Sequence, residues 1–163
     1  EDICVGLKQI AAENPAVEMV YPVHLNPNVQ EPVYRLLGST ANIHLMEPQD
    51  YLPMVHLMRN ASLILTDSGG VQEEATALGI PTLVLREVTE RPEGIQAGTL
   101  KLVGTDPARM AAEAKKALQP SQNRFSQFAT YNPFGDGHAA ERIVKILLKE
   151  QESRAEDVKS HTS

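Results

Sequence analysis

Residues 63–86 read LILTDSGGVQEEATALGIPTLVLR, and the fold is decided in this stretch. Leu63–Leu65 and Pro81–Leu85 are short, continuous apolar runs, which are typical of strands buried on both faces. Between them lie a glycine turn, Ser68-Gly69-Gly70, and a helix that we expect to begin near Val71. A strand, a turn, a helix and a second strand in direct succession form a βαβ unit. This unit predicts a parallel sheet flanked by helices.

The glycine turn is also a candidate binding site. Two adjacent glycines let the backbone approach a ligand closely, and the free N–H groups and dipole of the following helix favour an anion, such as a nucleotide diphosphate. Glu74 lies at the edge of the helix's apolar stripe and is better placed to reach a sugar hydroxyl than Glu73, which points roughly the opposite way. Two simpler interpretations stay open: a tight loop without a ligand, and glutamates that only complement the helix dipole.

Composition limits the number of domains and the partners. The chain has 163 residues, of which 42% are hydrophobic, so it can bury one core but is short for two domains. We expect one domain over residues 1–150 and a polar, disordered tail over residues 151–163. The formal net charge is −6 and no basic run is present, which argues against nucleic acid and anionic membrane surfaces as partners.

The compartment is predicted from cysteine usage and hydropathy. Cys4 is the single cysteine, which excludes an internal disulfide and a cysteine metal cluster and favours a reducing compartment. No apolar run approaches the roughly 20 residues needed to span a bilayer. We therefore expect a soluble, cytoplasmic protein.

The rest of the chain continues the alternation of strands and helices. Ile3, Leu7 and Ile10 fall at helical spacing from the first residue without a cap, so we expect a strand and loop upstream of the chain. Further strands are expected at residues 17–23, 43–46 and 99–103. Further helices are expected from the cap Asn28 up to Gly38, at Tyr51–Asn60 after Asp50, after Asp106-Pro107, and at residues 121–129. In a final helix we expect Ala140, Ile143, Val144 and Leu147 to form a buried stripe.

Loops that follow parallel strands gather at one edge of the sheet, where open α/β sheets bind ligands. His24, Gln49, the Ser68 turn and the segment after Leu85 are expected along this edge. The segment Arg86–Gly94 is polar and is interpreted either as an ordinary solvated loop or as the source of a phosphate partner, Arg91.

Several ordered motifs together resemble one enzyme family, the non-hydrolysing UDP-N-acetylglucosamine 2-epimerases of bacteria. The resemblance covers the chain up to Leu148 and rests on PVHLNPNV (22–29), TDSGGVQEEA (66–75), GIPTLVLR (79–86), TERPE (89–93), AGT (97–99) with LVGT (102–105), and NPFGDGHAAERI (132–143).

The resemblance implies a glycosyltransferase-B (GT-B) architecture, in which two Rossmann-like domains enclose a nucleotide sugar, and this chain is similar to the carboxyl-terminal, UDP-binding domain. By the family pattern Ser68, Gly69 and Gly70 hold the diphosphate, and Glu74 takes the ribose hydroxyls. Gln49 and Met54 border the uracil, and Arg91 is a further ligand contact. Met54 stands where phenylalanine is usual, so an aromatic packing surface is lost while apolar contact remains.

The family reaction interconverts UDP-N-acetylglucosamine and UDP-N-acetylmannosamine by eliminating and re-adding UDP. The carboxylates that move the C2 proton come mainly from the amino-terminal domain, so the resemblance implies no catalytic residue in this chain, an inactive fragment, and a homodimer for the full-length enzyme. It implies no metal, nicotinamide or other cofactor. His24 is implied in or near a regulatory UDP-sugar site; alternatively, it only orders the loop Asn26–Asn28.

Two other functions stay open at this stage. One is the donor-nucleotide half of a GT-B glycosyltransferase, and the other is a non-catalytic module that senses UDP-sugars.

Overall fold

A computed structural model of the chain describes residues 1–119 and 132–160, with the backbone alone described for residues 151–160. The contacts within the chain form two units, Glu1–Tyr131 and Asn132–Ser163, whereas composition places a boundary near residue 150. The helix expected at residues 121–129 lies outside the described residues. In chain order the elements are α1 (Asp2–Glu13), β1 (Met19–Pro22), α2 (Pro27–Leu37), β2 (Ile43–Met46), α3 (Tyr51–Asn60), β3 (Ile64–Thr66), α4 (Gly69–Ala77), β4 (Thr82–Val84), α5 (Pro92–Gln96), β5 (Leu100–Leu102), α6 (Pro107–Leu118) and α7 (Ala139–Ser160).

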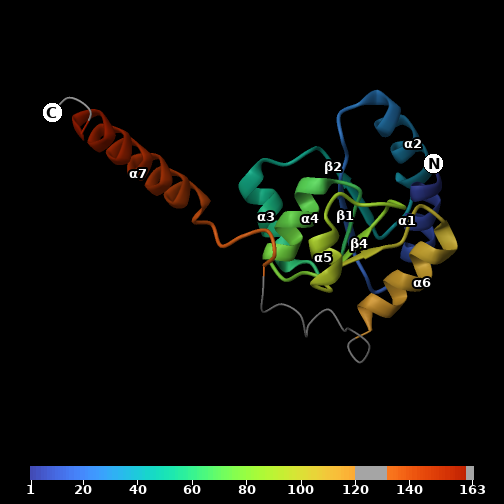
Figure 1. The fold of residues 1–163 in the computed structure, drawn as a ribbon. Coiled ribbons are helices and arrows are strands. Elements are labelled where there is room, and N and C mark those ends of the chain that lie inside the picture. Colours follow the sequence, from blue (N-terminus) through green and yellow to red (C-terminus); the bar gives the residue numbers. More distant parts are fainter. Residues whose placement is uncertain (120–131, 161–163) are drawn as a thin grey trace. The chain divides into compact units, whose positions relative to one another are not determined.

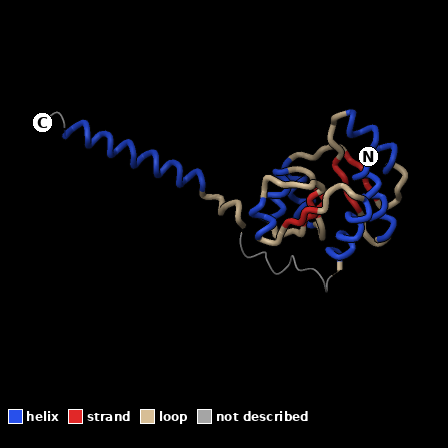
Figure 2. The backbone as a smooth tube through the Cα atoms, turned by 45° about the vertical axis from the view of Figure 1, so that its right-hand side comes forward, coloured by secondary structure: helices blue, strands red, loops and turns tan. Residues whose placement is uncertain are grey.

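The strands of the first unit are short and pair in parallel. β1 pairs with β2, with Met19 opposite Ile43. β4 lies between β3 and β5, with Thr82 opposite both Ile64 and Leu100. Figure 2 shows these strands surrounded by the helices of this unit. The expectation of a parallel α/β fold is therefore confirmed. Among the described residues, the hydrogen bonds join the strands into a two-stranded sheet, β1-β2, and a three-stranded sheet, β3-β4-β5.

The core of the first unit lies where α1 and α6 pack together and against the strands. Leu83 and Val84 of β4 are fully buried, as a central strand requires, and Met110 of α6 is buried completely. Gly6 allows the close approach of the two helices. A Cβ atom at Gly6 would lie 2.7 Å from Sδ and Cε of Met110 and 3.3 Å from Cα of Pro107. A side chain at Gly6 would therefore force the end of the Met110 side chain to move, so packing favours glycine here.

Two helix caps show how the sequence sets the element boundaries. α2 is capped by Asn26 rather than by Asn28 as predicted, because the Asn26 Oδ1 atom accepts a hydrogen bond from the Asn28 amide at 2.9 Å. Pro27 then occupies the first helical position, where its fixed φ is favourable. The predicted cap of α6 is confirmed, since Asp106 Oδ1 accepts from the Arg109 amide at 2.8 Å.

The second unit differs from the sequence prediction in two respects. The predicted apolar stripe of α7 is exposed: Ile143, Val144 and Leu147 keep 57%, 53% and 58% of their surface accessible. The reason is that this unit, taken by itself, has no other helix or strand among its described residues to cover the stripe. The backbone is also helical to Ser160, past the start of the predicted tail at residue 151, in a segment rich in residues of high helix propensity.

None of the described helices is both long and apolar enough to cross a membrane.

Candidate functional site

The glycine turn joins β3 to α4, and its own hydrogen bonds fix its shape. The Ser68 amide donates to Thr66 Oγ1 at 3.0 Å, and Ser68 Oγ accepts from the Val71 amide at 3.5 Å. Ser68 is the N-cap, so α4 begins at Gly69, two residues before the predicted start. The amides of Gly69 and Gly70 have no hydrogen-bond partner within the part of the chain that the structure describes. These two N–H groups are thus available at the positive end of a helix.

Nothing in the fold itself requires glycine at either position. Neither Gly69 nor Gly70 has a positive φ, and both have helical backbone. A Cβ atom at Gly70 would meet nothing within 4 Å, and one at Gly69 would meet only the Arg91 guanidinium at 3.6 Å, an ordinary contact. Glycine is unfavourable inside a helix by about 1 kcal/mol relative to alanine. An unfilled space beside two free amides is what a closely approaching ligand needs.

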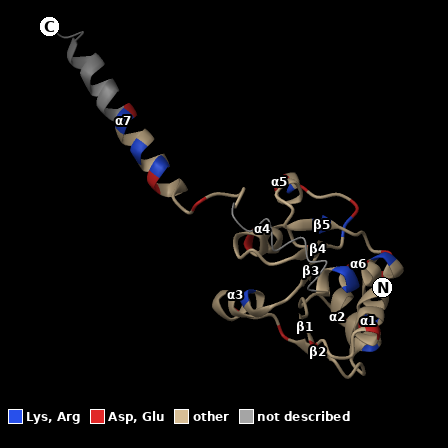
Figure 3. Ribbon diagram, turned by 90° about the horizontal axis from the view of Figure 1, so that it is seen from below, with Lys and Arg blue, Asp and Glu red and all other residues tan. Residues whose placement is uncertain are grey.

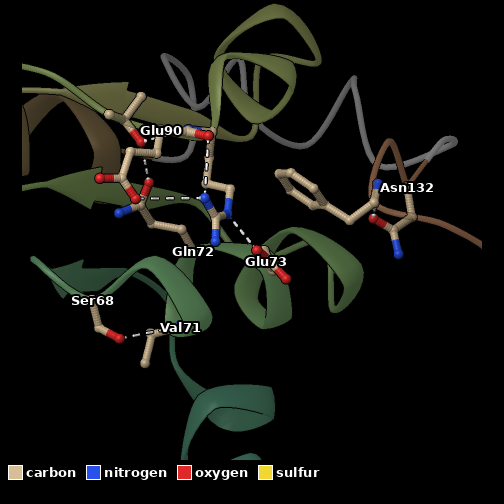
Figure 4. Close-up of polar contacts among 9 residues, drawn as sticks. Ser68, Val71, Gln72, Glu73, Glu90 and Asn132 are labelled. Atoms are coloured by element: carbon tan, nitrogen blue, oxygen red, sulfur yellow. Dashed lines mark hydrogen bonds and ion pairs between the residues drawn. The ribbon is translucent and has the colours of Figure 1, made fainter.

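Arg91 reaches the same turn from the loop after β4. Its Nε donates to Glu73 Oε1, and its Nη1 donates to the Glu90 carbonyl oxygen at 3.2 Å (Figure 4). Its Nη2 is the atom that would lie 3.6 Å from a Cβ at Gly69. The guanidinium therefore lies beside the first turn of α4, where its positive charge adds to that of the helix N-terminus and is partly offset by the paired Glu73 carboxylate.

A buried amide anchors the loop that carries Arg91. Gln72 is only 1% exposed, and its Oε1 accepts a hydrogen bond from Thr89 Oγ1 at 2.7 Å. Thr89 Oγ1 in turn accepts from the Arg91 amide at 3.1 Å. The loop then enters the short helix α5, which the sequence analysis missed. Pro92 at its first position and Glu93 in its first turn are the local signals that could have indicated it.

The helices α4 and α5 are in contact, and Figure 3 shows acidic residues on α4 and charged residues around α5. Glu73, which lies about 100° around the helix from Glu74, is the one that pairs with Arg91. Glu74 is partly buried, and the described residues provide it with no side-chain hydrogen bond or ion pair. Its carboxylate remains available to a ligand, whereas Glu73 is already used within the protein.

The remaining predicted residues, Gln49, Met54 and His24, make no hydrogen bond or ion pair with this arrangement among the described residues. Gln49 is exposed in the loop after β2, where its Nε2 donates to the Glu47 carbonyl oxygen at 2.8 Å, and Met54 is partly buried near the start of α3. The exposed His24 accepts at Nδ1 from the Asn26 amide at 3.1 Å, as expected for a histidine that orders its loop.

Two further properties describe the chemistry of this sheet edge. Burial raises the pKa of the Tyr21 phenol at the end of β1, and the nearby Cys4 and the Asp67 carboxylate raise it further, so Tyr21 stays protonated at neutral pH. In the described ranges, 1–119 and 132–160, no three histidine, cysteine or acidic side chains are grouped so as to hold a metal ion. The assembled groups are suited to binding an anion.

Comparisons with known proteins agree on one family. A family model described as UDP-N-acetylglucosamine 2-epimerase matches residues 1–148. The UDP-N-acetylglucosamine 2-epimerase of Salmonella typhimurium is 56% identical over 147 residues, which are 90% of this chain and 39% of that protein. The chain thus spans about two fifths of the length of the curated relatives it matches.

Solved structures give the same result. The S. aureus protein MnaA in a structure with UDP matches with a TM-score of 0.85 and 40% identity, over 93% of this chain and 40% of that one. A UDP-GlcNAc 2-epimerase from Neisseria meningitidis bound to UDP-GlcNAc matches with a TM-score of 0.77 and 45% identity, over 91% of this chain and 40% of that one.

Proposed function

This chain belongs to the UDP-N-acetylglucosamine 2-epimerase family, and on that premise we propose that it is the UDP-binding part of such an enzyme. The whole enzyme would interconvert UDP-N-acetylglucosamine and UDP-N-acetylmannosamine by eliminating and re-adding UDP. The chain spans about 39% of its relatives, so the remaining part of the reaction would be supplied by a domain beyond the matched region.

The observation that carries the proposal is the glycine pair at the start of α4. Gly69 and Gly70 offer two free amides, and a side chain at either position would clash with no described part of the protein. Their absence of side chains is explained by a ligand that comes close to the backbone. A diphosphate would accept hydrogen bonds from these amides and from Arg91 Nη2, whose position beside Gly69 supports the assignment.

The other predicted residues take roles around that anchor. The uncommitted carboxylate of Glu74, on the same helix, would accept hydrogen bonds from the ribose hydroxyls. Gln49 and Met54 would border the uracil, with Met54 providing an apolar contact. His24 would lie in or near a second, regulatory UDP-sugar site. We propose no catalytic residue in this chain, since the carboxylates for proton transfer at C2 would come from the missing domain, and the full-length enzyme would be a cytoplasmic homodimer.

Titration of the purified 163-residue chain with UDP tests the proposal. Isothermal titration calorimetry should detect UDP binding, and two-dimensional NMR should place the largest amide shifts at Gly69 and Gly70. Uridine, which lacks the diphosphate, should bind more weakly and leave these two amides almost unchanged. A folded chain that binds no UDP, or that binds it without affecting Gly69 and Gly70, would overturn the assignment. The chain alone should not epimerise UDP-N-acetylglucosamine.

A further inference from the structure

The ion pair between Glu73 and Arg91 raises an electrostatic problem for the proposed site. Glu73 Oε1 accepts from Arg91 Nε, and the two side chains are 41% and 30% exposed. A carboxylate this close to a diphosphate site should repel the ligand, because like charges at short range disfavour each other. Removing Glu73 should then strengthen binding, unless the residue does something for the ligand that outweighs its charge.

The hydrogen bonds of the Arg91 guanidinium indicate what Glu73 could do for the ligand. Arg91 Nε is bonded to Glu73, and Nη1 to the Glu90 carbonyl oxygen. Among the described residues no hydrogen bond occupies Nη2, which is the nitrogen beside Gly69. Two of the three nitrogens are thus held by the protein, and the third faces the start of α4. A planar guanidinium with two of its nitrogens held in place can present its third nitrogen in one orientation only.

We propose that Glu73 is a positioning residue that orients Arg91 toward the ligand. This role rests on the proposed function, since it requires a diphosphate at the start of α4. Gln72 and Thr89 set the backbone position of Arg91, and Glu73 sets the direction of its side chain. Gln72 and Glu73 are neighbours on α4, and together they hold the Arg91 loop and the Arg91 guanidinium beside the N-terminus of the same helix. An arginine held in this way loses less conformational entropy when the ligand binds.

The first test examines the ligand-free chain. In the ¹⁵N-labelled 163-residue protein, the Nε–H signal of Arg91 is identified by its loss in Arg91→Lys. We expect slow exchange of this proton with water in the wild-type chain, fast exchange in Glu73→Ala, and slow exchange again in Glu73→Gln, whose side-chain oxygen still accepts a hydrogen bond. Equal exchange rates in wild type and Glu73→Ala would overturn the proposal.

The second test measures UDP affinity by calorimetry. We expect Glu73→Ala to weaken binding by roughly two- to fivefold, as for the loss of one partly exposed ion pair, and Glu73→Gln to restore it. Glu93→Ala is the matched control, because Glu93 is an exposed carboxylate on α5 with no ion pair among the described residues, and it should leave the affinity unchanged or slightly higher. In an Arg91→Ala background, Glu73→Ala should not weaken binding further.

The outcomes separate this proposal from the function on which it rests. If the wild-type chain binds UDP and Glu73→Ala tightens binding or leaves it unchanged, the positioning role is overturned while the UDP site stands. A further loss of affinity in the Arg91→Ala background would also overturn it, because Glu73 would then act independently of Arg91. A folded wild-type chain without affinity for UDP would overturn both.

Discussion

Gly6 and the pair Gly69-Gly70, all in helices of the first unit, have opposite explanations. Gly6 on α1 is surrounded by protein atoms, with the space for a Cβ already occupied by Met110 and close to Pro107. Gly69 and Gly70 on α4 have free space beside them and helical backbone, so the protein would accept alanine at both. A glycine in a helix is therefore informative only together with its surroundings. At Gly6 the reason for glycine is packing, and at Gly69 and Gly70 we propose a ligand as the reason.

The largest expected effect falls on the packed region. Met110→Ala removes a completely buried side chain between α6 and α1 and should destabilise the chain by about 2–5 kcal/mol, because it leaves a cavity. Urea denaturation followed by circular dichroism measures this loss. UDP affinity below the unfolding transition should not change. A loss of UDP affinity in the folded variant would show that the packed region and the glycine turn are coupled. The two regions could then not be explained separately.

The second largest effect is expected on UDP affinity at the glycine turn. Gly70→Ala adds a methyl group beside the two free amides and should weaken UDP binding by roughly ten- to hundredfold, the equivalent of about 1.5–3 kcal/mol for a hydrogen bond to a charged group. Its stability should be unchanged or higher by up to about 1 kcal/mol, since alanine favours the helix. Calorimetry and thermal unfolding of the same sample check both. A destabilised variant with normal affinity would reverse our interpretation of Gly70.

A smaller loss of stability is expected for Gly6→Ala. The new methyl group would overlap with the end of the Met110 side chain, and overpacking of this kind costs about 1–3 kcal/mol. The flexible methionine can move aside, so we expect the lower part of that range. The double variant Gly6→Ala/Met110→Ala sharpens the comparison, because the space is then free and the cost at Gly6 should largely disappear. Equal costs in both backgrounds would contradict the packing explanation.

The smallest effect concerns pH. Hydrogen bonds from Lys101 and Lys116 lower the pKa of the Glu113 carboxyl on α6, although partial burial opposes them. A folded-state pKa below the unfolded value stabilises the chain above the unfolded pKa, and this contribution is lost as the pH falls through the folded pKa. Glu113→Gln should therefore lower stability at pH 7 by a few tenths to about 1 kcal/mol.

This difference between wild type and Glu113→Gln should begin to shrink near the unfolded pKa of glutamate, about 4.3, and should vanish only below the lower pKa of the folded state. Urea titrations of both proteins at pH 7, 5 and 3.5 give the comparison. A difference that grows toward low pH would have the wrong sign. Because Lys101 belongs to β5 and Glu113 to α6, the effect reports on the packed region and should be absent from UDP affinity.

Local signals made most of the fold predictable. The limits of β2 and α3 were predicted correctly from an apolar run and a capped, amphipathic segment, and the start of α6 was predicted correctly from Asp106-Pro107. The glycine turn was also recognised in sequence, because its residues are adjacent. What local pattern could not supply was the pairing of Glu73 with Arg91, since these residues are 18 positions apart and meet only through the packing of α4 and α5.

Burial depends on partners in the same way. The stripe of α7 has the spacing of a buried helix face, yet within its own unit no described element covers it. Periodicity shows which face of a helix is apolar, but only the neighbouring elements determine whether that face is buried. The short helix α5 was missed for a different reason. Its five residues are too few to show any period.

The bonds that Ser68 makes within its own turn have a kinetic consequence. The serine amide, hydroxyl and carbonyl are each engaged with Thr66, Val71 or Gln72 before any nucleotide arrives. The proposed diphosphate site therefore needs no refolding of this turn when a nucleotide binds. Encounter rates should then depend on diffusion and ionic strength rather than on a slow rearrangement, so that differences in affinity among nucleotides would arise mainly from how fast they leave.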